Sequence, residues 1–194
     1  MHLCASNHRV MLCLDLVKIG AALLLVPIPC LAQNTVTQTL EATIFPLGGL
    51  YTQSTPVSLI KSNSNFNTFT GTMTLSYRAR TSQGSGQGSI TVKATSDFSP
   101  TGGPSIASPP SKGDTFTYTC SGATLGASCS GTQTVSTTAA MNVVTLGASA
   151  CTGGGAPCST SDPNMANVTF ILTDDPNYKT GSYSATLTWT ISAS

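Results

Sequence analysis

Few residues of this chain suit metal binding or catalysis, and the densest group of them is Asp174-Asp175-Pro176-Asn177. Carboxylate and amide oxygens are the ligands that Ca²⁺ prefers, so Asp174, Asp175 and Asn177, with Asp162 as a further ligand, form a candidate calcium site. Their spacing does not match an EF-hand loop. The same residues are typical of a turn in which Asx side chains bond the local backbone. We favour the turn.

Histidine is confined to the N-terminal end of the chain, at His2 and His8. If that end is removed, as argued below, the mature chain lacks the base for Ser-His-Asp or Cys-His catalysis and the commonest metal ligand. Ser-Lys catalysis needs a partly desolvated lysine, and Lys61 and Lys93 fall at exposed positions of the pattern. Most acids lie in loop-like sequence, which disfavours paired-carboxylate hydrolysis. The sequence therefore predicts a protein without catalytic residues and without a cofactor.

Four cysteines remain beyond the N-terminal end. An even number in an exported chain indicates disulfides, and four cysteines allow three connectivities. We expect the two local pairs, which enclose eight and six residues. These intervals are longer than the two to four residues typical of zinc ligands. The expected pairs are Cys120 with Cys129 and Cys151 with Cys158.

The N-terminal end has the features of a secretory signal peptide. The apolar run Ile19–Val26 follows Arg9 and Lys18, and Cys30-Leu31-Ala32 places small side chains at the −3 and −1 positions of a cleavage site. The run is shorter than the roughly 20 residues of a membrane-spanning helix. We predict a signal peptide over residues 1–32.

Two alternatives concern the ends of this signal. Met11 is an alternative start of the chain, because residues 11–32 alone make a complete signal peptide. Lipid attachment at Cys30 is the less favoured alternative, because Pro29 occupies a position where a lipoprotein signal normally has a small residue.

The mature chain carries almost no charge. From Gln33 onward it has six basic and six acidic side chains, so its net charge is zero. No basic field exists to attract nucleic acid or an anionic membrane. A neutral surface also gives little protection against self-association, which suits a protein that assembles.

The clearest structural element is the last one, Tyr183–Ile191, in which apolar and hydroxyl side chains alternate without a break. A period of two is the pattern of a half-buried β-strand. We predict a central strand whose core anchors are Tyr183, Leu187 and Trp189, the only tryptophan of the chain.

Similar alternation predicts further strands along the chain. Residues 69–80 and 90–94 are expected to form a hairpin with a flexible tip at 82–88. A short helix at Ala139–Met141 is possible within the region 133–146, and residues 98–114 form a Pro/Gly-rich loop. The other predicted strands are 34–44, 50–60 with a break at Pro56, 115–120 and 167–173.

Eight to ten strands separated by turn residues predict an all-β fold, an immunoglobulin-like β-sandwich, with a barrel as the second choice. The sandwich would span residues 33–194 as one domain. The loop at 98–114 is a connection within it, because the part before the loop is too short to bury a good core alone.

Parts of the sequence resemble two families of known proteins. The sequence Tyr183-Ser-Ala-Thr-Leu-Thr-Trp-Thr-Ile191 resembles the distal motif of bacterial WxL cell-wall domains, in which a tyrosine and three variable residues precede Leu-Thr-Trp and an aliphatic residue. The signal, the alternating first strand and the closing Gly181-Ser-Tyr183 are similar to secreted fimbrial and spore-coat-U-type subunits. Both resemblances imply a bacterial envelope protein.

We therefore expect a secreted, non-catalytic protein of the cell surface with a structural or adhesive role. A carbohydrate- or cell-wall-binding module is the alternative, and a small exported hydrolase is a third. The expected partners are other copies of the chain, envelope proteins or glycans. Neither nucleic acid nor a transmembrane segment of the mature chain is expected.

Overall fold

The structure is a computed structural model that describes most of the chain beyond its N-terminal region. The described residues form two compact units, Met1–Glu41 and Ala42–Ser194. In the first, β1 (Ala5–Ser6) pairs antiparallel with β2 (Arg9–Val10). Most of the predicted signal peptide, with Cys30, lies outside the described residues, which are 5–6, 9–10, 38–51, 55–63, 65–111, 113–154 and 158–194.

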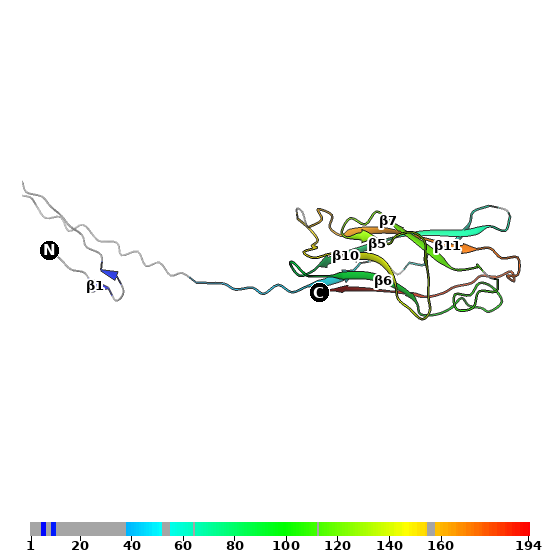
Figure 1. Cartoon of the computed structure of the whole chain (residues 1–194), viewed down its shortest axis with the longest axis horizontal. Helices are drawn as coiled ribbons and strands as arrows, with labels where there is room; N and C mark the ends of the chain where they lie inside the picture. The colour runs from blue at the N-terminus through cyan, green and yellow to red at the C-terminus, as the bar shows by residue number, and fades with distance from the viewer. Residues whose placement is uncertain are drawn as a thin grey trace, which may run out of the picture. The chain divides into compact units, whose positions relative to one another are not determined.

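The second unit has two antiparallel sheets and, among its described residues, no helix (Figure 1). One sheet has the order β3-β5-β11-β7-β9, with β4 also paired to β5; the other has the order β12-β6-β10-β8. Ten strands in two sheets agree with the predicted β-sandwich. Their bounds are β3 Leu47–Leu50, β4 Ile60–Lys61, β5 Thr68–Arg80, β6 Gly88–Ala94, β7 Thr117–Ser121, β8 Ala127–Ser128, β9 Gln133–Thr134, β10 Met141–Leu146, β11 Asn164–Thr173 and β12 Leu187–Ala193.

The longest pairing joins β5 to β11, from Thr68 opposite Thr173 to Tyr77 opposite Asn164. Alternate side chains of both strands point to opposite faces, so Leu75 and Tyr77 of β5 and Val168, Phe170 and Leu172 of β11 enter the core. The hydroxyl residues of β5 face outward. On the outer face, the Thr72 and Thr169 hydroxyls lie 3.0 Å apart. These threonines therefore pair across the strands at the surface.

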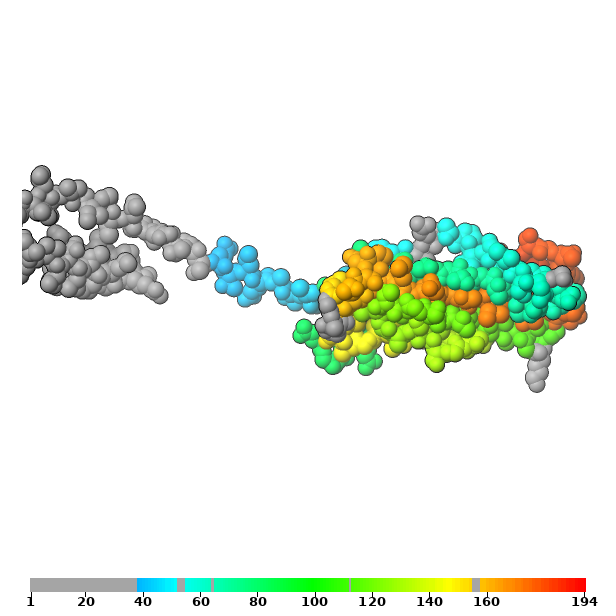
Figure 2. Space-filling model, turned by 90° about the horizontal axis from the view of Figure 1, so that it is seen from above, coloured from blue at the N-terminus to red at the C-terminus, as the bar shows by residue number. Residues whose placement is uncertain are grey.

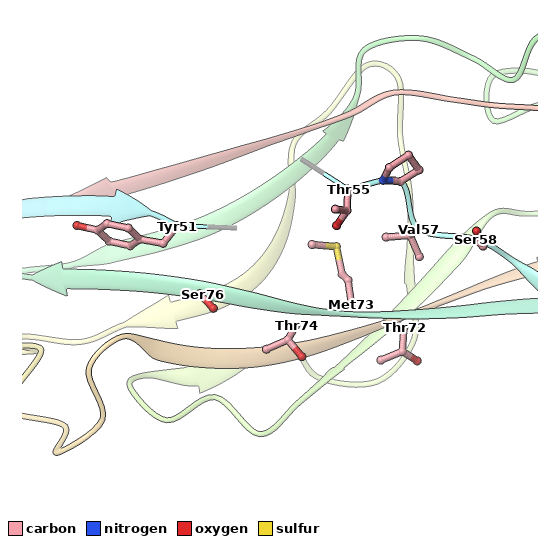
Figure 3. Close-up of a pocket in the computed structure, with 9 residues that line it drawn as sticks. Tyr51, Thr55, Val57, Ser58, Thr72, Met73, Thr74 and Ser76 are labelled. Atoms are coloured by element: carbon pink, nitrogen blue, oxygen red, sulfur yellow. The ribbon is translucent and has the colours of Figure 1, made fainter. Parts of the chain in front are cut away.

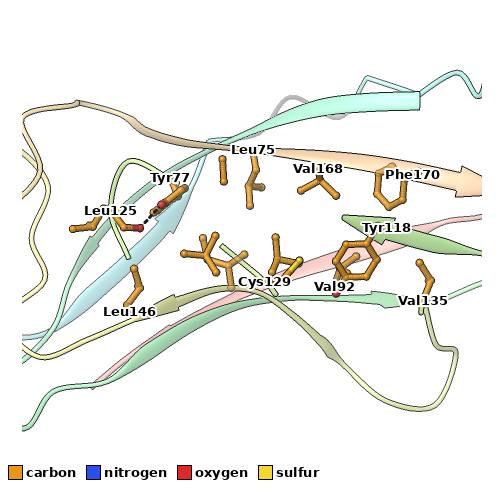
Figure 4. Packing of buried hydrophobic residues seen from close by; sticks show 14 of the residues in the cluster. Leu75, Tyr77, Val92, Tyr118, Leu125, Cys129, Val135, Leu146, Val168 and Phe170 are labelled. Carbon is orange, nitrogen blue, oxygen red and sulfur yellow. Dashed lines mark hydrogen bonds between the residues drawn. The ribbon is translucent and has the colours of Figure 1, made fainter. Parts of the chain in front are cut away.

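The core lies between the two sheets. Figure 4 shows Leu75 and Val168 of the larger sheet pointing toward Val92 and Leu146 of the smaller one. All four are at most 1 % exposed. The Tyr118 hydroxyl, also in the core, donates to the backbone carbonyl of Asn142 at 2.7 Å. The apolar side chains of the alternating strands thus pack together in one core between the sheets, as in a β-sandwich.

Both expected disulfides are present, Cys120–Cys129 and Cys151–Cys158. The first ties the end of β7 to the residue after β8 and so links the two sheets. The second closes a loop between β10 and β11. The local connectivity favoured from the spacing is therefore the one observed.

The predicted hairpin of residues 69–80 and 90–94 is wrong. Its strands, β5 and β6, belong to different sheets, so residues 81–87 carry the chain across the sandwich. The buried Thr81 hydroxyl donates to the Gly147 carbonyl at 2.7 Å, and the Ser82 N–H donates to the Ser194 carbonyl at 2.9 Å. These hydrogen bonds attach Thr81 and Ser82, where the crossover begins, to segments that are far away in the sequence.

The final strand has the predicted faces, but its predicted extent and central position are wrong. β12 begins at Leu187 and is an edge strand paired with β6. Its odd-numbered face is half-buried and its even-numbered face is exposed. Tyr183 lies outside the core cluster, with its hydroxyl donating to the Lys179 carbonyl at 2.6 Å. Alternation reports which face is covered and says nothing of how many neighbours a strand has.

Two smaller predictions are also wrong. Of the predicted strand 34–44, residues 34–37 lie outside the described residues and residues 38–44 form no strand; β3 starts at Leu47 and contains the Gly48-Gly49 pair that was expected to end the strand. Gly48 suits this place because a Cβ there would lie 2.8 Å from Ile191 Cγ1. Met141 begins β10 and residues 135–140 are irregular, so the helix is absent. The predicted strand 50–60 is also largely absent: only Leu50, the last residue of β3, and Ile60, the first of β4, lie in strands, and the described residues between them do not.

Candidate functional site

One side of the sandwich is incompletely closed. On this side β3 and β4 pair with the two ends of β5, opposite residues 77–80 and 69–70. Between these ends, residues 71–75 of β5 have β11 on one side and no strand of the described residues on the other. In the second sheet, the edge strand beside this gap is β12, which contacts β3. We call this side the open flank.

An apolar groove of about 600 Å³ lies at the open flank, between the two sheets. None of the described residues that line it is charged. Most of its large apolar side chains are half-buried, as expected of walls that still face solvent. A partly covered apolar groove favours an extended apolar partner. The walls and floor include Leu50, Val57, Leu59, Met73, Phe116, Phe170, Leu187 and Trp189.

Trp189 lies on an aromatic floor in this groove. Its ring meets Phe170 edge-on, with ring centroids 6.4 Å apart, and Phe170 stacks on Phe116 at 5.4 Å. Phe170 and Phe116 are 2 % and 5 % exposed, whereas Trp189 is half-buried. Trp189 thus packs against the core with one side and lines the groove with the other.

A second hollow, of about 590 Å³, opens over the outer face of β5 and has mostly hydroxyl side chains. In Figure 3, Met73 points from β5 toward Thr55 and Val57, whereas Thr72 and Thr74 point to the opposite side. Thr55 and Val57 line both hollows. The chain over this part of β5 therefore has open space on two sides.

The residues before β3 expose large apolar side chains. Ile44 and Phe45, and Leu47 at the start of β3, are 69 %, 68 % and 67 % exposed; the chain that leads into β3 is light blue in Figure 2. Arg80 fixes the end of this segment that is nearest β3, through two hydrogen bonds to the Phe45 carbonyl. Leu40, in the N-terminal unit, is 89 % exposed. Ile44, Phe45 and Leu47 thus form an exposed apolar segment where the chain enters β3.

The candidate calcium ligands do not converge. Asp174 contacts the Lys61 ammonium at 2.7 Å, and Asp162 pairs with Arg78. Asp175 accepts a hydrogen bond from the Asn177 N–H at 2.6 Å, the bond of an Asx turn. Among the residues that the structure describes, no group of three acids, cysteines or histidines is placed to hold a metal ion.

A carboxyl pair that the sequence did not indicate lies beside this turn. Asp114 and Asp175 are 8 % and 5 % exposed. The hydrogen bond that the protonated Asp114 carboxyl donates to Asp175, together with burial, raises the pKa of Asp114 to about 6. The same hydrogen bond lowers the pKa of Asp175 to about 2. Below about pH 6 the two carboxyls therefore hold one proton between the loop before β7 and the loop after β11.

Comparison with known proteins adds no assignment, because no protein-family model, curated protein or solved structure matches this chain. The described part of the chain contains no helix with the length and apolarity needed to cross a membrane.

Sequence reasoning found part of this site and missed the rest. Leu187 and Trp189 were expected in the core, and both line the groove. Val57, Leu59 and Met73 carried no distinctive signal, because their role depends on a gap in strand pairing between distant segments. The apolar alternation before Pro46 was visible, but it was assigned to a strand of the same sandwich.

Proposed function

We propose that this protein is a secreted, non-catalytic structural subunit of the cell surface, in which copies of the chain join end to end. One observation carries the proposal: an exposed apolar segment precedes a sandwich whose flank has an unfilled apolar groove. The segment of one copy, residues 42–47, would occupy the groove of the next. The resemblance of the sequence to envelope subunits supports the same role.

The segment cannot readily fill the groove of its own sandwich. Along β5, the partners of β3 run from Arg80 opposite Leu47 to Tyr77 opposite Leu50, and the open stretch 71–75 follows. Residues 42–46 precede Leu47, so they leave the sandwich beyond Arg80, away from that open stretch. Reaching it would require β3 to break and reverse. A second copy can supply the segment without that cost.

The chemistry of the groove fits an added strand. An extended peptide beside β5 would gain main-chain hydrogen bonds, while alternate side chains enter apolar pockets. Ile44 and Phe45 would leave water for walls formed by Leu187, Trp189 and Met73, a gain of about 25 cal/mol per Å² of apolar surface buried. No charged side chain of the described lining opposes this.

Secretion and the finer fold class belong to the same proposal. We infer removal of residues 1–32 as a signal peptide and an immunoglobulin-like arrangement of the sandwich. Two disulfides support an oxidising compartment, since such bonds rarely persist in the cytosol. The even division of charge in the mature chain leaves no net repulsion between copies.

A second candidate function has its own observation, the hydroxyl-lined hollow of Figure 3. Tyr51 at its edge is 52 % exposed and lies under the Arg78 guanidinium, 4.8 Å from ring centroid to Cζ. An aromatic side chain beside hydroxyl groups is the composition of a carbohydrate-binding surface. Binding on a glycan array that is lost in Tyr51→Ala would favour this candidate.

The test of assembly uses the mature chain, residues 33–194, and a variant that lacks residues 33–46. Light scattering after size exclusion should show oligomers whose mass rises with concentration for the first and a monomer for the second. A peptide of residues 33–47 should bind the shortened variant and shift the emission of Trp189. A mature chain that stays monomeric at every concentration contradicts the proposal.

A further inference from the structure

The open flank is partly covered by a short segment that belongs to neither sheet. Residues Thr55–Leu59 cross the gap between β3 and β4 and form no strand. We call this segment the strap. Val57 and Leu59 point inward and are half-buried, whereas Pro56 and Ser58 are exposed. The strap therefore lies over the place where an added strand would pair with β5.

The strap cannot itself complete the edge of the sheet. Nine residues, 51–59, separate β3 from β4, whereas six residues, 71–76, separate the β5 residues with which they pair. The three extra residues force the chain out of the ladder. Pro56 also lacks the N–H that a ladder needs. Its hold on the flank thus rests on the side chains of Val57 and Leu59.

The space around the strap is loosely filled. Thr55, Pro56 and Val57 form part of the wall of both hollows, of about 590 and 600 Å³. A segment without ladder bonds, with Pro56 and Ser58 exposed, opens at lower free energy than the paired strands beside it. The two hollows give the strap room to move.

The strap packs directly against Gly71 of β5. A Cβ at this residue would lie 2.7 Å from the Ser58 carbonyl oxygen, 2.9 Å from Leu59 Cδ2 and 3.0 Å from Val57 Cγ1. The backbone of Gly71 does not have the left-handed conformation that requires glycine. Close approach is therefore the reason for glycine here, and the closed position of the strap depends on the missing side chain.

We propose that the strap is a movable cover of the groove, which lies on Gly71 in the free protein and swings away when the segment of a second copy enters. This inference rests on the proposed assembly and adds its regulation. The closed strap shields Met73 and the β5 edge, which lowers the fraction of chains competent to accept a partner. An exposed edge strand is prone to indiscriminate pairing, and a cover of this kind limits it.

The test locks the strap with a disulfide in the full mature chain. In Val57→Cys/Gly71→Cys, the 3.0 Å approach between a Cβ at 71 and the Cγ1 position of residue 57 suits a bond, and this covalent bond keeps the strap at residue 71 although the new Cβ crowds the Ser58 carbonyl. The matched control, Val57→Ser/Gly71→Ser, has similar side chains and no bond. Peptide mapping confirms the bond, and circular dichroism confirms the fold of both variants. We expect the locked variant to stay monomeric while the control assembles.

Gly71→Ala provides an independent second variant. Its Cβ disfavours the closed strap and leaves the open one unaffected, so assembly should become faster than wild type, by roughly tenfold. Locked and serine variants that assemble equally fast would overturn the strap as a gate and leave the assembly proposal intact. A slower Gly71→Ala would also overturn it. If wild type and all variants stay monomeric, the proposed function fails and the gate fails with it.

Discussion

The guanidinium of Arg80 donates two hydrogen bonds to the backbone carbonyl of Phe45, with N···O distances of 2.9 and 2.6 Å. This contact lies where the chain enters β3, opposite Arg80 itself. It fixes the point at which the exposed apolar segment leaves the sandwich. In the proposed assembly, this direction of exit favours a second copy, rather than the same copy, as the acceptor of the segment.

The first prediction concerns this segment. Ile44→Asp/Phe45→Asp should abolish assembly of the mature chain, because each carboxylate would have to enter the uncharged groove. Unfolding stability should change little, since both side chains are more than two-thirds exposed. Mass by light scattering and urea denaturation measure the two effects. Gln38→Asp/Thr39→Asp adds the same charge further from β3, and it should assemble like wild type. An equal loss of assembly in both variants would show that the added negative charge, and not the loss of Ile44 and Phe45, prevents assembly.

A second prediction contrasts the two faces of β12. Trp189→Ala should lower the free energy of unfolding by roughly 2 kcal/mol, less than the 3–5 kcal/mol of a fully buried tryptophan, because this side chain is half-buried. Thr188→Ala, on the exposed face, should cost about 0.5 kcal/mol or less. Urea denaturation gives both values. An unchanged midpoint in Trp189→Ala with assembly lost would instead make Trp189 purely a contact residue.

The disulfides provide a third prediction. Thiol titration of the exported protein under denaturant should find no free thiol from Cys120 or Cys129, and peptide mapping should recover the two as a pair. Cys120→Ser/Cys129→Ser should cost roughly 2–3 kcal/mol, from the entropy that the bond removes from the unfolded chain. Crossed linkage to Cys151 or Cys158 would contradict the observed pairing.

The shared proton of Asp114 and Asp175 predicts how stability depends on pH. The pKa of Asp114 is raised from 3.8 to about 6, so its contribution is full below pH 3.8 and is lost as the pH rises through 6. The pKa of Asp175 is lowered to about 2, so its contribution is present above pH 3.8 and is lost as the pH falls toward 2. Together the pair favours the folded state most between about pH 4 and 6.

Urea midpoints at pH 2.5, 5 and 7.5 measure this dependence. Asp114→Asn retains a donor for Asp175 and cannot ionise, so it should flatten the decline between pH 5 and 7.5. Asp97→Asn, in the same β6–β7 connection, serves as the control for a lost carboxylate whose pKa is lowered by its hydrogen bonds. A wild-type curve without a decline above pH 5 would show that the two carboxyls are not coupled.

A last prediction concerns export. The secreted protein should begin at Gln33, within a residue or two, because Ala32 is the small residue before the predicted cleavage site. N-terminal sequencing decides this. A protein that begins at Cys30 and carries lipid would be a lipoprotein.

The strands themselves were largely predictable because alternation is a local property. In β5 and β12, alternating apolar and polar side chains mark both the extended backbone and the face that meets the core. The two disulfides were also predictable, since short intervals bring their cysteines together at little entropic cost. Residues two apart in a strand point to the same face, so the sequence alone indicated which face of each strand is buried. Strands with one buried face in turn predicted a β-sandwich.

Which strands become neighbours was decided by the tertiary structure alone. The sequence cannot show that β5 and β6 lie in different sheets or that β12 ends its sheet, because pairing depends on the packing of segments far apart in the chain. For the same reason it cannot show the gap beside residues 71–75 or the strap on Gly71. The apolar alternation before Pro46 predicts a strand in either case; only the folded arrangement leaves residues 42–45 without a paired strand among the described residues.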